Sequence, residues 1–169
     1  PAEAPAPPTI SGIGAMRRST IRPTTIATDN DGAVSAPATV TITVTGTVDT
    51  GNVTFASGSG AIVLSGGTLN LAAASTITVN NASDTIGSVL AGAATSLTKA
   101  GTGTLTLMDS ASLNGANNYS GVTTISAGTL QIGTGGTTGT LGTGNVVDNG
   151  ILSFKRSNTY VVTNLISGL

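Results

Sequence analysis

The chain of 169 residues and 16.3 kDa is long enough for one domain, or for one domain with an appendage, and its 24 glycines and 31 threonines make up about a third of it. It contains no Cys, His or Trp, which excludes thiol nucleophiles, disulfides, histidine bases and nearly every zinc or copper site, and we expect no cofactor. Six basic and seven acidic residues give a net charge of −1 without a basic stripe, and two Phe with two Tyr make no base-stacking platform, so we expect no nucleic-acid partner.

Residues 1–23 are predicted to form a Pro-rich extended segment. Four of the six prolines lie in residues 1–8, where their fixed φ and missing N–H favour an extended chain. No signal peptide is recognisable, and no apolar run approaches the ~20 residues that a membrane helix needs. The chain begins at Pro1 without a Met. We therefore expect an excerpt or a processed product that does not insert into a membrane by this segment.

Residues 24–48 are predicted to form a β-hairpin, or strands that pair with or cap the region that follows. Thr24–Thr28 and Ala38–Thr47 flank the turn-forming sequence Asp29-Asn30-Asp31-Gly32. The second strand alternates apolar residues with threonine, which is typical of a half-buried strand. Its apolar residues are candidates for an assembly strand: Val40, Ile42 and Val44.

The same turn offers weak candidates for calcium ligands. Asp29 and Asp31 supply clustered carboxylates, which hard cations prefer. An EF-hand loop is excluded, because the twelfth position from Asp29 is Val40 rather than Glu. A plain turn is the alternative interpretation, and we assign no metal site.

Residues 49–169 show uninterrupted short strands with a recurring template of Gly, any residue, apolar, polar, apolar. The template occurs at four places whose spacing shortens along the chain: Gly67–Leu71, Gly103–Leu107, Gly128–Ile132 and Gly150–Phe154. Further short strands are expected between these segments: Asn52–Phe55, Ala61–Leu64, Thr76–Val79, Thr85–Leu90, Val122–Ile125, Asn145–Val147 and Thr159–Val162. No ten-residue stretch has a helical period, so we expect almost no helix.

This pattern favours a β-solenoid over a β-sandwich. A sandwich would show about seven strands of more even length with turns every ~8–12 residues. In a solenoid each rung stacks on the next, aliphatic side chains line the interior, and Gly or Asn turn the corners. Candidate corners are Asn80-Asn81, Asn114-Gly115, Asn117-Asn118 and Asp148-Asn149-Gly150. The predicted fold class is all-β.

Residues 97–131 resemble the autotransporter-associated β-strand repeat of bacterial surface proteins. The match combines Leu97-Thr98-Lys99-Ala100-Gly101-Thr102-Gly103-Thr104-Leu105-Thr106-Leu107 with a link from Asn117 to Gly121 and a final strand up to Leu130. The resemblance implies a right-handed parallel β-helix that is secreted and has no enzymatic role. The residues that carry it are Lys99, Gly101, Gly103, Leu105, Leu107, Tyr119, Gly121, Gly128 and Leu130.

Two features depart from simple repeats of this kind. Met108–Leu113 is an additional stretch that we expect to leave the solenoid as a loop. Thr24–Thr45 is similar to the last hairpin of bacterial Ig-like surface domains, but the earlier strands of such a domain are missing.

We expect Lys99 to lie on a rung surface or at a corner.

Other functions would each require a particular set of residues. A carbohydrate-active β-helix would need a pair of carboxylates, and four of the aspartates are spread singly in expected corners: Asp49, Asp84, Asp109 and Asp148. Tyr119 and Tyr160 are candidates for stacking on surface glycans, although packing is the simpler role. Thr-x-Thr arrays suggest ice binding, but they recur irregularly: Thr41/Thr43/Thr45, Thr76/Thr78 and Thr102/Thr104/Thr106.

The sequence therefore predicts a structural module of a bacterial surface or extracellular protein: a stalk, fibre or adhesin shaft without catalytic residues. The ends of a solenoid present unpaired strand edges, so head-to-tail self-association by β-augmentation is a further hypothesis. A carbohydrate-binding or carbohydrate-active β-helix is the alternative function, with ice binding behind it.

Overall fold

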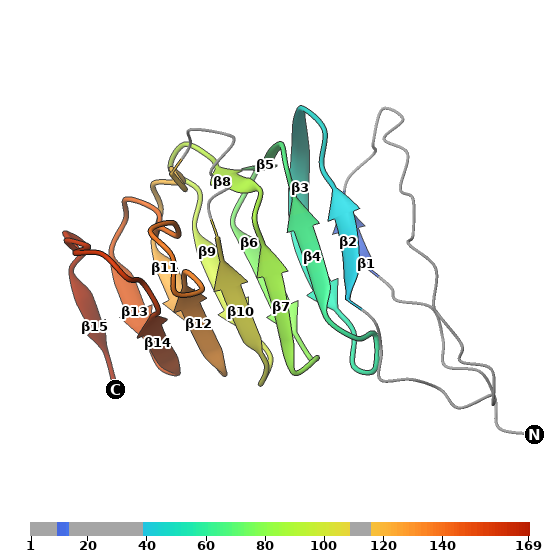
Figure 1. Ribbon diagram of the computed structural model, residues 1–169. Coiled ribbons are helices and arrows are strands. Elements are labelled where there is room, and N and C mark those ends of the chain that lie inside the picture. Colours follow the sequence, from blue (N-terminus) through green and yellow to red (C-terminus); the bar gives the residue numbers. More distant parts are fainter. Residues whose placement is uncertain (1–9, 14–38, 109–115) are drawn as a thin grey trace, which may run out of the picture.

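The computed structural model describes residues 10–13, 39–108 and 116–169, and these residues form strands and loops without any helix. Figure 1 shows the strands stacked side by side along one axis, from β1 near the N-terminus to β15 near the C-terminus. The prediction of an all-β solenoid with almost no helix is confirmed, and its right-handed winding stays a prediction.

The strands form two sheets that run the length of the stack. The six-stranded sheet has the order β14-β12-β10-β7-β4-β2, and the nine-stranded sheet has the order β15-β13-β11-β9-β6-β3-β5-β8, with β1 paired to β3. The strand bounds are β1 Ile10–Ile13, β2 Val40–Thr43, β3 Thr47–Phe55, β4 Ile62–Ser65, β5 Thr68–Leu71, β6 Ser75–Val79, β7 Ser83–Ile86, β8 Val89–Ala91, β9 Leu97–Ala100, β10 Thr104–Leu107, β11 Thr123–Ile125, β12 Thr129–Ile132, β13 Val146–Asp148, β14 Ile151–Phe154 and β15 Ile166–Gly168.

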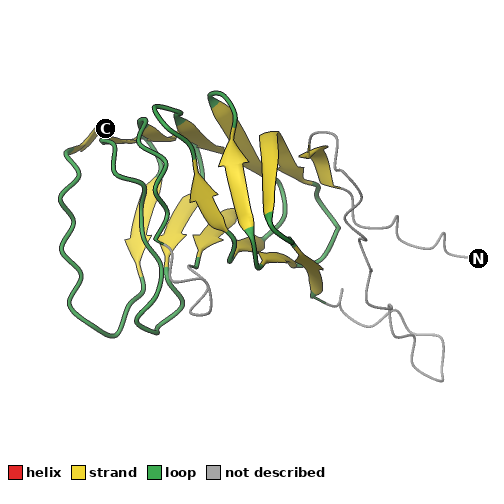
Figure 2. Ribbon diagram, turned by 90° about the horizontal axis from the view of Figure 1, so that it is seen from above, coloured by secondary structure: helices red, strands yellow, loops and turns green. Residues whose placement is uncertain are grey.

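Each rung passes through three faces. In the first rung, the single strand β3 contributes to two of them. Its first half pairs with β5, and its second half pairs with β6. Between the halves, Gly51 and Asn52 are both exposed, which breaks the alternation of buried and exposed residues. We call the six-stranded sheet face 1, the column β3–β5–β8 face 2, and the column from β3 through β6, β9, β11 and β13 to β15 face 3. Face 2 has no strand after β8, and Figure 2 shows loops gathered on one side of the C-terminal half.

Parallel pairing in register stacks like positions into columns that fill the core. On face 1 the inward columns are Val40–Ile62–Asp84–Leu105–Leu130–Leu152 and Ile42–Leu64–Ile86–Leu107–Ile132–Phe154. Leu105, Leu107, Leu130 and Ile132 are all 0% exposed. Burial of such aliphatic side chains is worth about 1.5–3 kcal/mol each, so the narrow interior stabilises the stack rung by rung.

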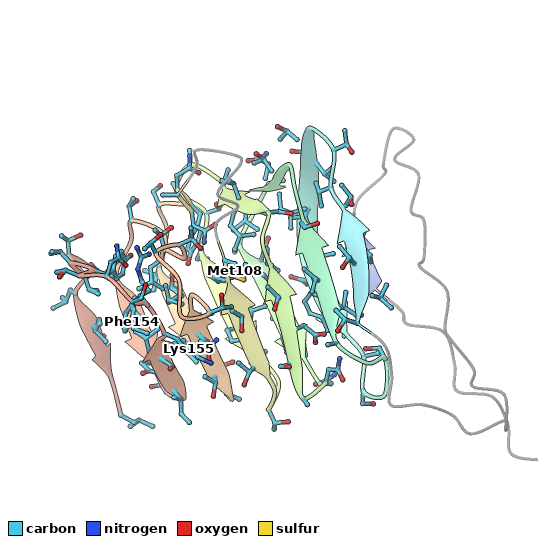
Figure 3. The ribbon with its side chains drawn as sticks, in the orientation of Figure 1. Met108, Phe154 and Lys155 are labelled. Carbon is cyan, nitrogen blue, oxygen red and sulfur yellow. The ribbon has the colours of Figure 1, made fainter. Side chains whose placement is uncertain are left out.

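The rung length is nearly constant along face 1. Val40 pairs with Ile62 and Thr129 pairs with Ile151, so rungs near both ends of the stack have the same length. The rung from Thr104 to its partner Thr129 is slightly longer, and it contains the segment predicted to leave the solenoid. Residues 109–115 lie outside the described part of the chain, whereas Met108 follows β10 directly (Figure 3).

One predicted strand is wrong, and one template segment lies on a different face from the other three. The segment Gly67–Leu71 forms β5 on face 2, whereas the other three template segments form β10, β12 and β14 on face 1, so the first and longest interval joined two different faces. Thr159–Val162 is not a strand, and the last strand is β15. In addition, Thr85–Leu90 contains a corner at Gly87 and Ser88 that divides β7 from β8.

The N-terminal end of the stack consists of β1 and β2. Of the predicted hairpin, residues 24–38 lie outside the described residues. β2 pairs in parallel with β4 and forms the first rung of face 1, with Val40 and Val44 buried and Ile42 half-buried. β1 pairs antiparallel with β3.

Candidate functional site: the repeat segment and the solenoid ends

The repeat segment occupies the middle of the stack, from β9 to β12. Leu97 and Lys99 alternate with half-buried Thr98 and Ala100, so both side chains point into the core from face 3. Leu105 and Leu107 do the same from face 1 in the next strand. β9 and β10 thus contribute inward side chains to the core from two different faces.

The sequence predicted that Lys99 lies either on a rung surface or at a corner. The surface position is wrong, because Lys99 is fully buried in a column between Ile77 and Ile125. Its ammonium reaches the corner, where Nζ donates to the carbonyl oxygens of Ala100 at 2.8 Å, Gly101 at 2.8 Å and Ala127 at 3.1 Å. Burial lowers the pKa of Lys99 to about 8, so the ammonium stays mostly protonated at neutral pH. Lys99 therefore ties the corner of its own rung to that of the next.

The repeat glycines sit where successive corners touch. We call the segments 56–61, 80–82, 101–103, 126–128 and 149–150 the glycine corner, because they connect face 3 to face 1. A side chain on Gly103 would collide with the carbonyl oxygen of Asn81, and one on Gly128 would lie 2.5 Å from the carbonyl oxygens of Gly101 and Gly103. Gly101 also has a φ of 76°. These positions exclude a Cβ because of backbone contact between rungs.

Tyr119 and Gly121 form the link between β10 and β11, where face 2 has lost its strand. The Tyr119 ring is 0% exposed and packs in the core, its N–H donates to Leu90 O, and its hydroxyl lies 2.8 Å from Oγ1 of Thr123. Burial raises the pKa of the Tyr119 phenol. Gly121 lies against the backbone of Thr95. A ring in this position cannot stack on an external sugar.

Two asparagines replace the missing strand pairing on face 2. Asn117 accepts from Leu90 N–H at 2.8 Å through Oδ1 and donates to Thr140 O at 2.8 Å through Nδ2. Asn164 donates to Gly142 O at 2.9 Å and to Gly144 O at 2.5 Å. Each side chain satisfies backbone groups of a neighbouring rung, which a strand would otherwise satisfy.

These contacts give every residue of the motif a place in rung stacking. A family model described as the passenger-associated-transport-repeat matches residues 97–132. The chain carries a passenger repeat. The resemblance stated from residues 97–131 is thereby confirmed, with almost the same bounds.

The chain is also similar to a known adhesin. Over 50 residues the chain is 56% identical to the adhesin BmaC autotransporter of Brucella suis biovar 1 (strain 1330). The match covers 30% of this chain and 1% of that protein. No solved structure matches the chain.

The aspartates are separated along the stack. Asp49 is exposed in β3 and accepts from Asn70 Nδ2 at 2.7 Å. Asp148, at the end of β13, accepts from the N–H groups of Gly150 at 3.1 Å and Leu152 at 3.2 Å. Asp109 lies outside the described residues. The described aspartates therefore do not face one another across a groove.

Asp84 differs from the solvated corner residue that the sequence suggested. It is 1% exposed and occupies an inward position of β7 between Ile62 and Leu105. Oδ1 accepts from Ile62 N–H at 2.8 Å and Asn81 Nδ2 at 3.0 Å, while Oδ2 is buried without a hydrogen-bond partner. Burial raises the pKa of Asp84, against the opposing effect of these two hydrogen bonds.

Tyr160 lies in the last rung beside Arg156. The Arg156 guanidinium carbon is 4.5 Å from the centre of the Tyr160 ring. The centres of the Phe154 and Tyr160 rings are 5.8 Å apart. The Tyr160 hydroxyl accepts from Leu141 N–H at 3.3 Å. Arg156 also donates to the carbonyl oxygens of Thr137 and Gly139. Both side chains thus hold the loop after β12 in place.

The threonine arrays do not make a regular outer column on face 1. The outward column of face 1 contains Thr41, Val63, Thr85, Thr106, Gln131 and Ser153. Thr106 is only 6% exposed. The column therefore lacks the repeated, exposed threonine that the ice-binding hypothesis requires.

The remaining candidates concern ions and membranes. Asp29 and Asp31 lie outside the described residues, and in residues 10–13, 39–108 and 116–169 no group of three acidic, His or Cys side chains could hold a metal ion. Within the same residues no helix has the length and apolar character to cross a membrane.

The structure adds functional residues that the sequence analysis did not assign: Asn117, Asn164 and Asp84 as inter-rung contacts. Two positions had a usable signal. Lys99 follows inward Leu97 by two residues, and Asp84 precedes inward Ile86 by two, so strict alternation would place both inside. Asn164 has no such signal, because no strand surrounds it.

Proposed function

We propose that this chain is a rigid shaft segment of a bacterial surface protein of the adhesin type. The observation that carries the proposal is the continuous rung stacking, in which parallel strands and buried polar side chains both join successive rungs. The passenger repeat and the similarity to an adhesin support display at the cell surface.

Pulling the two ends apart in a single-molecule force experiment tests the mechanical part of the proposal. We expect stepwise unravelling, because each rung contacts only its neighbours. A rung such as the one from Val40 to Ile62 should release about 75 Å of contour length when it is drawn out. Extension without resistance, or loss of the whole stack in one step, would contradict a rung-by-rung shaft.

Antibody labelling tests the location. Antibodies raised against the folded chain should label intact cells of the parent bacterium. Labelling that appears only after permeabilisation would contradict surface display.

We further propose that the module has no catalytic role. The wide separation of the described aspartates, with Asp84 facing the core and Asp49 facing solvent, supports this. Incubation with a panel of acidic and neutral polysaccharides should release no reducing ends, and product formation above a heat-denatured control would contradict the proposal.

The finer part of the proposal is end-to-end self-association of the 169-residue chain. Its support is the apolar surface of the last rung, where Ile151 is 58% exposed, Leu165 68% and Ile166 45%. Concentration-dependent oligomers in sedimentation, and rods in negative-stain images, are expected. Monodisperse monomers at high protein concentration would refute this part.

A further inference from the structure

β1 is antiparallel, whereas every other described strand pair is parallel. Ile10 pairs with Phe55, Ser11 with Thr54 and Ile13 with Thr50, with an irregularity between Ser11 and Ile13. This short strand therefore spans both halves of β3. It lies along the side of β3 that a preceding rung would occupy.

The two sheets differ at this end of the solenoid. β3 is covered by β1, whereas β2 pairs only with β4 among the described strands. Among the described strands, none pairs with the outer side of β2, which is where β-augmentation would add a strand. Within the described residues, β1 covers one of the two edges of the first rung, and no strand covers the other.

The last rung presents a surface of matching form. β14 and β15 each pair on one side only among the described strands. Phe154, the last member of an inward column of face 1, is 41% exposed at this end (Figure 3). Stacking this rung on the first rung of a second copy would place β14 beside β2 and β15 beside β3. Phe154 would then continue into Ile42, and Leu152 into Val40.

We propose that β1 is a displaceable cap that controls docking of the last rung of a second copy onto the first rung. The inference rests on the end-to-end association proposed above. While β1 is paired with β3, an incoming copy can pair only with the edge of β2. Once β1 has left, the incoming copy can pair with the edges of both β2 and β3. Because β1 is tethered to the same chain, the incoming copy competes against an effective concentration on the order of millimolar.

The test compares the full chain with a variant lacking residues 1–13 and with the double variant Ser11→Pro/Gly12→Pro. Proline has no N–H, and successive N–H groups of a strand point to opposite sides, so one of the two prolines removes a donor facing β3. We expect the association constant from sedimentation velocity to rise about tenfold or more in both variants. Hydrogen exchange of β3 amides should accelerate in their monomers.

Exposed side chains of the last rung supply the matched controls. Ile151→Lys with Ile166→Lys should abolish the association of the variant lacking residues 1–13, because both residues lie in the docking surface. Val122→Lys should leave it unchanged, because Val122 is 40% exposed on a middle rung.

The outcomes separate the two proposals. Equal association of the full chain and the shortened chain would overturn the cap while leaving end-to-end association intact. Unchanged exchange of β3 amides in the proline variant would also overturn it. Monomers in every variant would overturn both.

Discussion

The glycine corner and face 2 join successive rungs through different kinds of contact. At the glycine corner, the backbone of one rung touches that of the next, and Gly103 fits against Asn81 because it has no side chain. On face 2 beyond β8, the strands end, and Asn117 and Asn164 provide hydrogen bonds between rungs instead.

The difference shows where the repeat tolerates change. A corner built from close backbone contact fixes both residue type and spacing. Face 2 accepts the longer rung from Thr104 to Thr129, because side chains can reach across a gap that a strand pair cannot. Sequence variation should therefore concentrate between β10 and β11, while the corner residues stay small.

The largest expected effect separates a crowded glycine from an open one. Gly103→Ala should lower the free energy of unfolding by about 3 kcal/mol, because the new Cβ meets backbone that cannot move without shifting a rung. Gly136→Ala is the control, since nothing lies within 4 Å of its added Cβ. Urea denaturation measures both, and similar losses would show that corner contact is not the cause.

Removing an asparagine from face 2 should have the next largest effect. Asn117→Ala leaves Leu90 N–H and Thr140 O without these partners, which should cost about 2 kcal/mol of unfolding free energy. Asn118→Ala, on the exposed neighbour, should cost less than about 0.5 kcal/mol. Equal effects in thermal and urea denaturation would argue against the side-chain ladder.

Lys99 makes the stability of the corner depend on alkaline pH. The pKa of Lys99 is about 8 in the folded chain, below the ordinary value of 10.5, so the unfolded chain binds the extra proton between these values. Stability should rise from pH 8 to 10.5, with a slope no steeper than about 1.4 kcal/mol per pH unit. Lys99→Met should remove this slope, whereas Lys155→Met, on an exposed lysine, should keep it.

Asp84 should make stability depend on acidic pH, with the opposite sign. Its raised pKa means that the folded chain holds a proton that the unfolded chain releases, so stability falls as pH rises from 3.8 through the folded pKa. The stability of Asp84→Asn relative to the native chain should increase across this window by about 1.4 kcal/mol per unit of pKa shift. Asp49→Asn, on an exposed carboxylate, is the matched control. A constant difference between pH 3 and 7 would contradict the burial argument.

The sequence predicted the strands better than their arrangement. The Gly templates ending at Leu107, Ile132 and Phe154 correspond to β10, β12 and β14, and their intervals match the observed pairing. The same template at Gly67 lies on another face, because a five-residue pattern states that a strand follows a glycine and does not state which side of the rung it builds.

The polar interior was harder to predict. Charged residues are rarely buried without partners, so surfaces or corners are the expected places for Lys99 and Asp84. Alternation alone would place both side chains inside. The Lys99 ammonium, however, donates to the carbonyl oxygen of Ala127, which belongs to the next rung. Such contacts depend on rung length, which a single sequence does not fix before the register is known.

The burial of Lys99 also determines which peptide bonds of the folded chain are accessible to a protease that cuts after basic residues. Between Arg22 and Lys155 the sequence contains Lys99 as its single basic residue, and that residue is 0% exposed. Trypsin can therefore cut the folded shaft only at its last rung, at Lys155 or Arg156. The stacked rungs between Arg22 and Lys155 would survive digestion as one piece, and their release as small peptides would report unfolding of the corner itself.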